Sequence, residues 1–421
     1  MSTSELLILL NPWWKEGLVR EDLARPYRRN VFFEVIEALG LRQIQVLTGL
    51  RRVGKSTIMY QAIDWLIREG GVDPQKILYF SFDLRSMNLL DILKAYSRLG
   101  VNWRNERVYL FLDEVQKVES WPSWLKILYD SHPNLKIVVS GSSSLHLEEE
   151  ARKNLAGRYI LHKVEPLSLI EFFELKTGKV VNNPDLWREE LSSALEEYLK
   201  KPFPEIVNWS DLRAFEYVKE SVVERVAKSD LGPYLDQTRA MELLTLFYQE
   251  PGQYLNVASL SGELGMSKKT LYKYISYLES SYLIRTLRNY RPSFRASSRK
   301  MKRVYPYHWS LLFGVAWPDR GPLIESVVAS LINASHYWRE GRREVDFVLP
   351  ERLLPVEVKA REGIRGRDLD NLIYFMGKFG VKEGVIVHTG EDGTVKVDGL
   401  EVKALSLLSL CVHGLPLNRT S

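Results

Sequence analysis

The chain contains the loop Gly49-Leu50-Arg51-Arg52-Val53-Gly54-Lys55-Ser56-Thr57. Residues 44–48 before it have the length and apolar character of a buried strand, and apolar side chains recur with helical spacing after it, through Leu66. The two glycines let the backbone turn so that successive N–H groups face one point, and the following helix adds the positive end of its dipole. The sequence therefore predicts a loop that binds phosphate groups.

The spacing of this loop is that of a P-loop, which predicts ATP and Mg²⁺ as its ligands. We expect Lys55 to reach the β and γ phosphates and the Ser56 hydroxyl to bind Mg²⁺. The other residues expected to line the nucleotide are Gly49, Arg52, Gly54 and Thr57. An ordinary glycine turn is the alternative, but the strand before the loop and the helix after it disfavour that interpretation.

A second apolar strand, residues 108–112, ends in the acidic pair Asp113 and Glu114. Nucleotide hydrolysis needs a carboxylate on a neighbouring strand to hold Mg²⁺ through water, and usually a second one to polarise the attacking water. We assign the first role to Asp113 and the second to Glu114. A solvated strand end is the alternative interpretation of the pair.

Further strands are expected at residues 77–82, 137–140 and 159–164. Strands that alternate with helices predict a parallel sheet with helices on both faces, hence an α/β fold. The strand at 137–140 runs into a serine cluster, in which Ser142 is a candidate to sense the γ phosphate or to orient the water. Serines are also common in turns, so a structural role remains the alternative.

These segments resemble the archaeal and bacterial AAA+ ATPases of the P-loop superfamily whose nucleotide loop reads G-x-R-R-x-G-K-[ST]. The other matching pieces are Asn11-Pro12-Trp13-Trp14, Leu112-Asp113-Glu114-Val115-Gln116, Ser140-Gly141-Ser142-Ser143-Ser144, Ala156-Gly157-Arg158 and Pro166-Leu167-Ser168. The resemblance implies a helical lid after the core, and a homo-oligomer in which Arg158 completes a neighbour's site. The alternative for Arg158 is an ion pair with a surface acid.

Residues 255–279 predict two helices separated by the turn Gly265-Met266-Ser267, which is the helix-turn-helix pattern, and a following strand would make it a winged helix. In the second helix one face is apolar and the opposite face is basic. Lysines act as point charges, which suits contacts with DNA phosphates. The candidates are Lys268, Lys269 and Lys273. A protein contact is the alternative use of this module.

The positive charge of the chain is concentrated in one segment. The formal net charge is +5, but residues 236–320 alone carry thirteen Lys and Arg against six Asp and Glu. Arginines alternate with aromatic residues there, a pattern that suits neutralisation of a nucleic-acid backbone and stacking on bases. The DNA-contact candidates are Arg291, Arg295 and Arg299. A solvated linker is the alternative.

The last quarter of the chain holds Asp346 and, on a second strand, Glu357 and Lys359. This is the spacing of the PD-(D/E)xK nucleases, in which two acids hold Mg²⁺ and the lysine lies near the activated water. Glu325, on a preceding helix, could approach the same metal. The motif is weak by itself, but with Trp338-Arg339 before it, it resembles the nuclease-like domain that follows this ATPase and is likened to archaeal Holliday-junction resolvases.

One departure from that resemblance is Tyr307-His308, where an aspartate is expected. Many such domains keep the fold without cutting, so binding without catalysis stays open beside a live nuclease site. The sequence also predicts a cytoplasmic protein without a membrane span, because no apolar run approaches about 18 residues. The lone Cys411 excludes an intrachain disulfide and a cysteine zinc site.

We therefore expect an ATPase core at 1–165, a helical lid at 166–235, a winged helix at 236–290 and a nuclease-like α/β domain at 291–421. The expected function is Mg-ATP hydrolysis coupled to binding of DNA, including branched DNA, in repair or recombination. The alternative is a nucleotide-dependent switch or scaffold that binds a protein partner and carries an inactive nuclease fold.

Overall fold

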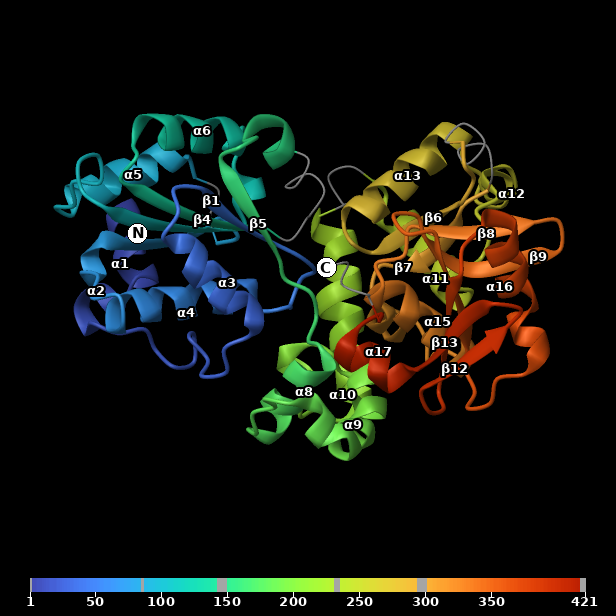
Figure 1. The fold of residues 1–421 in the computed structure, drawn as a ribbon. Helices are drawn as coiled ribbons and strands as arrows, with labels where there is room; N and C mark the ends of the chain where they lie inside the picture. Colours follow the sequence, from blue (N-terminus) through green and yellow to red (C-terminus); the bar gives the residue numbers. More distant parts are fainter. Residues whose placement is uncertain (1, 85–86, 142–149, 231–234, 294–300, 417–421) are drawn as a thin grey trace. The chain divides into compact units, whose positions relative to one another are not determined.

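The computed structural model describes residues 2–84, 87–141, 150–230, 235–293 and 301–416. The chain divides into two compact units, Met1–Pro166 and Leu167–Ser421. Each contains its own sheet, as the ribbon in Figure 1 shows. No helix in the described ranges has the length and apolar character that a membrane span requires.

In the first unit the described residues form a five-stranded, fully parallel sheet of order β2-β3-β4-β1-β5. Its strands are β1 (Ile44–Thr48), β2 (Ile77–Ser81), β3 (Val108–Asp113), β4 (Leu135–Gly141) and β5 (Tyr159–Lys163). The parallel sheet predicted from the alternation of strands and helices is confirmed. β4 lies between β1 and β3, so the strand that carries Asp113 is one place further from the P-loop strand than we expected.

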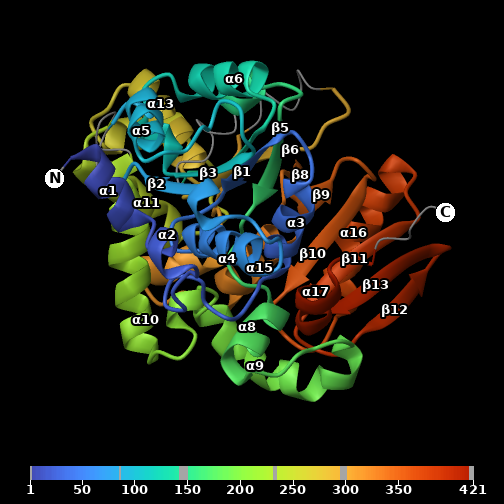
Figure 2. The ribbon, with the colours of Figure 1, turned by 90° about the vertical axis from the view of Figure 1, so that its left-hand side faces the viewer.

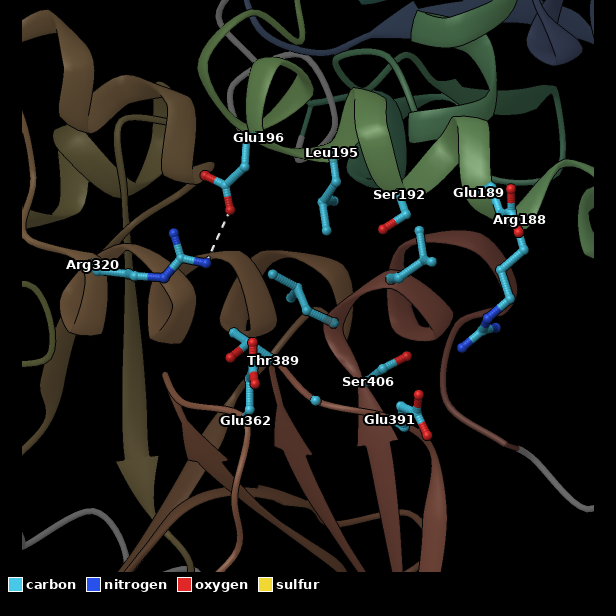
Figure 3. A pocket seen from close by; sticks show the side chains of 13 residues that line it. Arg188, Glu189, Ser192, Leu195, Glu196, Arg320, Glu362, Thr389, Glu391 and Ser406 are labelled. Carbon is cyan, nitrogen blue, oxygen red and sulfur yellow. Dashed lines mark hydrogen bonds and ion pairs between the residues drawn. The ribbon is translucent and has the colours of Figure 1, made fainter.

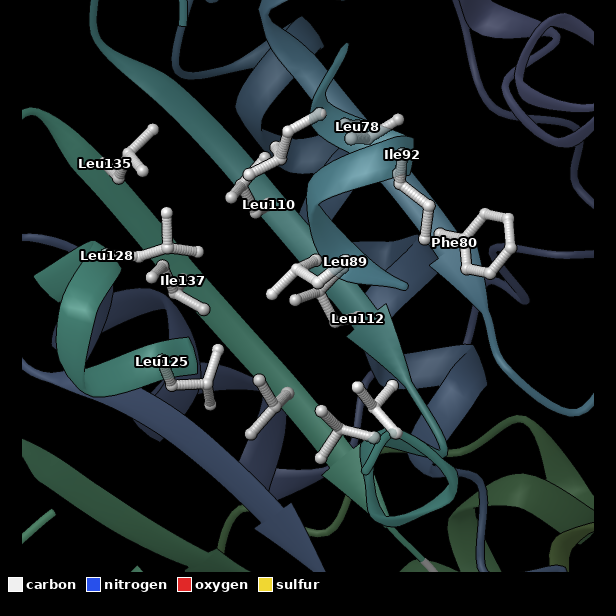
Figure 4. Close-up of a cluster of buried hydrophobic side chains, with 14 of the residues drawn as sticks. Leu78, Phe80, Leu89, Ile92, Leu110, Leu112, Leu125, Leu128, Leu135 and Ile137 are labelled. Carbon is white, nitrogen blue, oxygen red and sulfur yellow. The ribbon is translucent and has the colours of Figure 1, made fainter. Parts of the chain in front are cut away.

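Helices cover both faces of this sheet. They are α1 (Thr3–Leu10), α2 (Trp13–Glu16), α3 (Asn30–Leu39), α4 (Lys55–Arg68), α5 (Leu89–Arg98) and α6 (Trp121–Ser131), with short 3₁₀ turns at Pro74–Lys76 and Val115–Lys117. Helices α1, α5 and α6 bury apolar side chains on one face. Figure 4 shows Leu89 of α5 beside Leu112 of β3, and Leu125 and Leu128 of α6 beside Ile137 of β4. Helices α3 and α4 contact β1, β4 and β5. This burial of apolar area is the main stabilising contribution to the unit.

An N-terminal segment closes the free edge of this sheet. β2 is the edge strand, and the side chain of Asn11 bonds to the backbone of Tyr79 in both directions: Tyr79 N donates to Oδ1 (2.6 Å) and Nδ2 donates to Tyr79 O (3.0 Å). The indole N–H groups of Trp13 and Trp14 donate to the carbonyl of Ile77 (3.1 and 2.8 Å). The segment thus satisfies edge groups that would otherwise offer a template for pairing with another chain.

The second unit contains an eight-stranded mixed sheet of order β12-β13-β11-β10-β9-β8-β6-β7, counted over the described ranges. Its strands are β6 (Ile284–Asn289), β7 (Arg303–Pro306), β8 (His336–Glu340), β9 (Arg343–Leu349), β10 (Leu354–Lys359), β11 (Glu383–His388), β12 (Gly393–Val397) and β13 (Leu400–Ser406). β10, β11 and β13 run parallel and lie side by side in Figure 2. β9 pairs antiparallel to β10, which brings Asp346 close to Glu357.

The helices of this unit are α8 (Leu169–Thr177), α9 (Arg188–Lys200), α10 (Asp211–Tyr217), α11 (Gln237–Gln249), α12 (Val257–Glu263), α13 (Lys268–Ser280), α15 (Arg320–Leu331), α16 (Gly366–Phe379) and α17 (Leu407–His413). Short 3₁₀ turns lie at Pro184–Trp187, Pro204–Ile206 and Trp309–Gly314, and π-helical turns at Val218–Glu224 and Val226–Asp230. One apolar core joins α8, α9, α15 and α17 to one face of the sheet, and a second joins α16 to the other face.

The segment that we expected to act as a lid packs within the second unit. Tyr198 of α9 stacks edge-on against Trp309 at 5.6 Å between ring centroids, and the indole N–H of Trp309 donates to Leu199 O (2.9 Å). The expected boundaries at 235/236 and 290/291 also lie inside this unit, where β6 pairs with both β7 and β8. Movement of the lid with nucleotide state stays a prediction.

Replacing the edge-capping Asn11 with alanine should destabilise the first unit by about 2 to 4 kcal/mol, because two buried backbone groups of Tyr79 lose their partners. Calorimetric unfolding of the full chain measures this as a lower transition temperature. Asn105→Ala is the matched control, since that exposed side chain makes only a 3.4 Å contact with Asn102. Equal transition temperatures for the two variants would contradict the role given to Asn11.

Candidate nucleotide site and acidic cluster

The backbone of the predicted phosphate loop requires glycine at two places. Gly49 has φ +146°, and a Cβ there would lie 2.0 Å from the carbonyl oxygen of Val164, so no side chain fits. Gly54 has φ +96°, a conformation that other residues rarely adopt, and it faces open space. Arg52 also has a positive φ, 68°. The loop is therefore folded into the concave form that can surround an anion.

Lys55 is the first residue of α4 and lies beneath the loop. It is buried, and its ammonium donates to the carbonyl oxygens of Gly49 (3.0 Å) and Leu50 (2.7 Å). The ammonium is thus held at the loop itself, beside the N-terminal end of α4, where phosphate oxygens could replace these carbonyls as acceptors. Ser56 and Thr57 follow on the first turn of the same helix.

The carboxylate of Asp113 receives three hydroxyl groups. Ser56 and Tyr79 donate to Oδ2 (2.6 and 2.9 Å), and Ser140 donates to Oδ1. Ser140 lies on β4, the strand that intervenes between β1 and β3, and Ser56 reaches across from α4. The structure therefore brings Ser56 and Asp113 together, although β1, the strand before the loop, is not a neighbour of β3.

Burial and the negative charge of Glu114 raise the pKa of Asp113 above its usual value, while the hydrogen bonds from Ser140, Ser56 and Tyr79 oppose the rise. Each donor favours the charged form of the carboxylate. Desolvation therefore raises the pKa of Asp113, and the three hydroxyl donors limit the rise.

Glu114 follows directly in a left-handed conformation, with φ 56°. Its Oε2 accepts a hydrogen bond from Gln116 Nε2 (2.5 Å), and its backbone N–H points to Ser140 Oγ (3.4 Å). A positive φ in a glutamate is unusual and turns the side chain out of the strand direction. The other candidate for water positioning, Ser142, lies outside the described residues.

Arg158 immediately precedes β5, at the amino ends of the parallel strands, whereas the P-loop follows the carboxyl end of β1. Its guanidinium forms a two-pronged ion pair with Asp130, with N–O distances of 2.9 and 3.2 Å. Arg158 and the loop of the same chain thus lie at opposite ends of the parallel strands. The role of Arg158 in a neighbouring protomer's site stays a prediction. Within its own chain Arg158 pairs with a surface acid, which is the alternative that the sequence left open.

The four residues of the predicted nuclease-like site converge in the second unit. Asp346 Oδ2 accepts from the backbone N–H of Val358 (2.9 Å), and Lys359 Nζ contacts Glu357 Oε1 (2.6 Å). Glu325 lies near enough to Asp346 for its charge to act on that carboxyl. Burial and the charges of Glu357 and Glu325 raise the pKa of Asp346 well above its usual value.

Sequence reasoning missed two partners of these acids, Arg303 and Glu344. Arg303 Nη2 lies 2.9 Å from Glu325 Oε1, and Nη1 lies 3.1 Å from Glu344 Oε1 and 4.0 Å from Asp346 Oδ1. We call Glu325, Glu344, Asp346 and Glu357 the acidic cluster. Over the described part of the chain no three His, Cys, Asp or Glu side chains are grouped so as to hold a metal ion. The cluster as arranged does not fit Mg²⁺.

The exposed face of α13 is the predicted one. Leu271, Tyr274, Ile275 and Leu278 are buried, whereas Lys268, Lys269, Tyr272, Lys273 and Ser276 are exposed. Ser267 caps the helix by accepting from Thr270 N (3.1 Å). The predicted helices and turn are therefore present.

Of the arginine candidates, Arg295 and Arg299 lie outside the described residues. Arg291 is largely occupied: its Nη2 donates to Arg339 O (2.5 Å), and its side chain is 16% exposed. Arg285 is likewise bonded to Tyr307 O (2.6 Å). Part of the basic segment thus serves internal hydrogen bonds.

A pocket of about 890 Å³ lies in the second unit between α9 and the carboxyl ends of β11 and β13. Figure 3 shows Ser192 and Leu195 directed from α9 toward Thr389 and Ser406 at the strand ends. Its two arginines, Arg188 and Arg320, are paired with acids, and four glutamates line it. No residue predicted from the sequence lines this pocket, and its charge does not suit a phosphate.

Residues 41–173 match a family model described as an AAA domain. This part of the chain is therefore similar to an AAA domain. Residues 194–315 and 320–408 match two further models, each described as a domain of unknown function. The AAA match begins just before β1 and ends in α8, so it contains the loop, Asp113 and Glu114.

Relatives share much of the chain. An uncharacterized protein of Methanocaldococcus jannaschii is 29% identical over 324 residues, 68% of this chain and 67% of the relative. An uncharacterized protein of Haemophilus influenzae is 27% identical over 395 residues, 89% of this chain and 96% of the relative. Among solved structures, a Walker-type ATPase of Pyrococcus abyssi aligns with a TM-score of 0.44 and 15% identity, over 72% of this chain and 96% of that one.

The region that matches the AAA model has a donor set that suits Mg²⁺. A serine hydroxyl and a carboxylate, 2.6 Å apart, are hard oxygen ligands of the kind this ion prefers beside nucleotide phosphates. Sequence reasoning found both and missed Tyr79 and Ser140. Tyr79 could have been noticed because it places a phenol hydroxyl within β2, whose five residues are all buried, and a buried hydroxyl needs a hydrogen-bond partner.

Replacing Tyr79 with phenylalanine removes a hydrogen bond that lowers the pKa of Asp113. Because the ionised carboxylate is the form that can hold Mg²⁺, the acid limb of the pH profile of ATP turnover should move to higher pH. Tyr109→Phe, on the neighbouring strand, is the control and should leave the limb in place. An unmoved acid limb in Tyr79→Phe would show that the phenol does not tune Asp113.

Proposed function

We propose that this protein is a Mg²⁺-dependent ATPase. The observation that carries the proposal is the 2.6 Å contact between Ser56 Oγ and Asp113 Oδ2 beside a glycine loop that ends in Lys55. Loop N–H groups and Lys55 would bind the phosphates, and Ser56 and Asp113 would hold Mg²⁺, which neutralises charge on the phosphates when bound. The match to an AAA domain supports this assignment of roles.

Glu114 is the proposed general base. It follows Asp113 directly, and its hydrogen bond with Gln116 fixes the orientation of the carboxylate. In hydrolysis a water oxygen forms the bond to the γ phosphorus, the bond to the ADP oxygen breaks, and the water proton passes to Glu114. Asp113 accepts hydrogen bonds from Ser56, Tyr79 and Ser140, and these donors favour the ionised form that would hold Mg²⁺.

Two substitutions separate binding from hydrolysis. Lys55→Ala should abolish ATP binding, whereas Glu114→Gln should keep ATP bound and lower turnover by about 10²- to 10⁴-fold. Fluorescent-nucleotide titration and phosphate release measure the two effects. Lys126→Ala removes an exposed lysine of α6 and serves as the control. Unchanged turnover in Lys55→Ala would rule out this site as the seat of hydrolysis.

We propose that DNA is the macromolecular ligand and that α13 contacts it. Lys268, Lys269 and Lys273 lie on one exposed face with Tyr272, and the surrounding residues 236–320 carry a net charge of +7. Point charges on an exposed helix suit phosphates rather than base edges, so binding should depend more on DNA shape than on sequence. Branched DNA and a role in repair or recombination follow from this preference as the proposed setting.

The proposal includes no cutting step. The acids of the cluster are engaged with Arg303 and Lys359, which supports a site without a catalytic metal ion. The second unit is therefore proposed to bind DNA and to leave its strands intact. The specific alternative is a switch that binds a protein partner through the α12–α13 pair.

Salt dependence distinguishes the two ligands. DNA affinity should fall steeply between 50 and 200 mM salt, and Lys268→Ala/Lys269→Ala should reduce the slope of log affinity against log salt by about 2. Fluorescence anisotropy with linear, flapped and four-way DNA measures this, with and without a nonhydrolysable ATP analogue. Lys396→Ala, whose side chain is 77% exposed, is the control. A flat salt response would favour the protein partner.

A further inference from the structure

We infer that the guanidinium of Arg303 acts as a built-in cation that occupies the acidic cluster of the second unit and excludes divalent metal from it. This inference is independent of ATP hydrolysis at the P-loop. It concerns what the cluster binds, and it explains why residues with the spacing of a nuclease motif are arranged without a place for an ion.

The guanidinium of Arg303 is held in place by three acids and a backbone carbonyl. The residue lies on β7 and is 9% exposed. Its two terminal nitrogens contact Glu325 and Glu344 at 2.9 and 3.1 Å, and one of them lies 4.0 Å from Asp346. Its third nitrogen, Nε, donates to the carbonyl of Gly252 (2.6 Å). One guanidinium thus meets acids from α15 and β9 and a backbone carbonyl that follows α11.

The groups around Arg303 suit the planar guanidinium of an arginine. Gly252 has φ +85°, and a Cβ there would lie 2.6 Å from Arg303 Nη2 and 2.8 Å from the hydroxyl of Tyr305. Rings of Tyr254, Tyr305 and Tyr337 lie 5.9, 5.2 and 6.0 Å from the guanidinium carbon. Aromatic faces and a planar fork of donors suit arginine, whereas Mg²⁺ requires oxygen ligands on all sides.

Two of the three tyrosines also hold the acids in place. Tyr305 donates to Glu325 Oε1 (2.5 Å), and Tyr254 donates to Glu344 Oε2 (2.6 Å). These carboxylates are therefore directed at Arg303 by second partners. A metal ion would have to displace the guanidinium and break this set of contacts together.

The charge of the cluster explains what would follow from loss of Arg303. Four carboxylates face three cations, Arg303, Lys359 and, at 4.0 Å from Glu344, Arg339. One oxygen of the cluster, Glu357 Oε2, is buried without a hydrogen-bond partner in the described residues. Arginine keeps its proton at any pH a protein tolerates, so its charge is permanent. Without it, buried negative charge would be left uncompensated, which is strongly unfavourable unless another cation enters.

The test counts Mn²⁺ bound to the full chain by electron paramagnetic resonance, in an Asp113→Asn background that weakens the P-loop site and without nucleotide. The parent should bind no ion at the cluster. Arg303→Met should gain a site, and adding Asp346→Asn should remove it. Arg303→Lys keeps the charge and should stay metal-free, and Arg291→Met removes a positive charge elsewhere in the unit and should gain nothing.

Two results would overturn the inference. One is Mn²⁺ bound by the parent and lost with Asp346→Asn, which would show a metal site beside the intact arginine. The other is an Arg303→Met chain that is folded by circular dichroism and still takes up no ion. If that variant does not fold, the measurements on the parent with and without Asp346→Asn still decide whether metal is excluded.

Discussion

The buried carboxylate of Asp113 is the group on which the first unit depends. Taking an ionised carboxylate out of water is costly, and three hydroxyl donors from α4, β2 and β4 offset the cost. The same contacts fix the spacing between the loop and the acid at the end of β3. Folding of the sheet and assembly of the candidate site therefore occur together, because the sheet brings these donors to Asp113.

The features predicted correctly from the sequence are those whose functional residues lie close together in the chain. The glycine loop, the acid pair after β3 and the lysine face of α13 each lie in one continuous segment with a clear period or spacing. The missed groups are those contributed by distant segments. Ser140 and Arg303 acquire their roles only when strands pair, and the order of β1, β4 and β3 could not be read from strand periodicity.

The distribution of positive charge illustrates the same limit. The sequence places the excess between residues 236 and 320, and a count treats every arginine as available to a ligand. In the folded unit Arg285 bonds to backbone carbonyls, Arg291 is mostly covered and Arg303 is enclosed by acids. The charge that remains exposed on α13 belongs to lysines. A basic segment can thus serve the interior of a domain as much as its surface.

The closure of the β2 edge has a consequence for the timing of folding. Asn11 is synthesised before its partner, the backbone of Tyr79, which follows 68 residues later and whose phenol reaches Asp113. Asn11 must therefore wait, unpaired, until β2 has been synthesised. A change that disturbs the docking of Asn11 would therefore act on the carboxylate of Asp113 from a distance, through the single residue Tyr79.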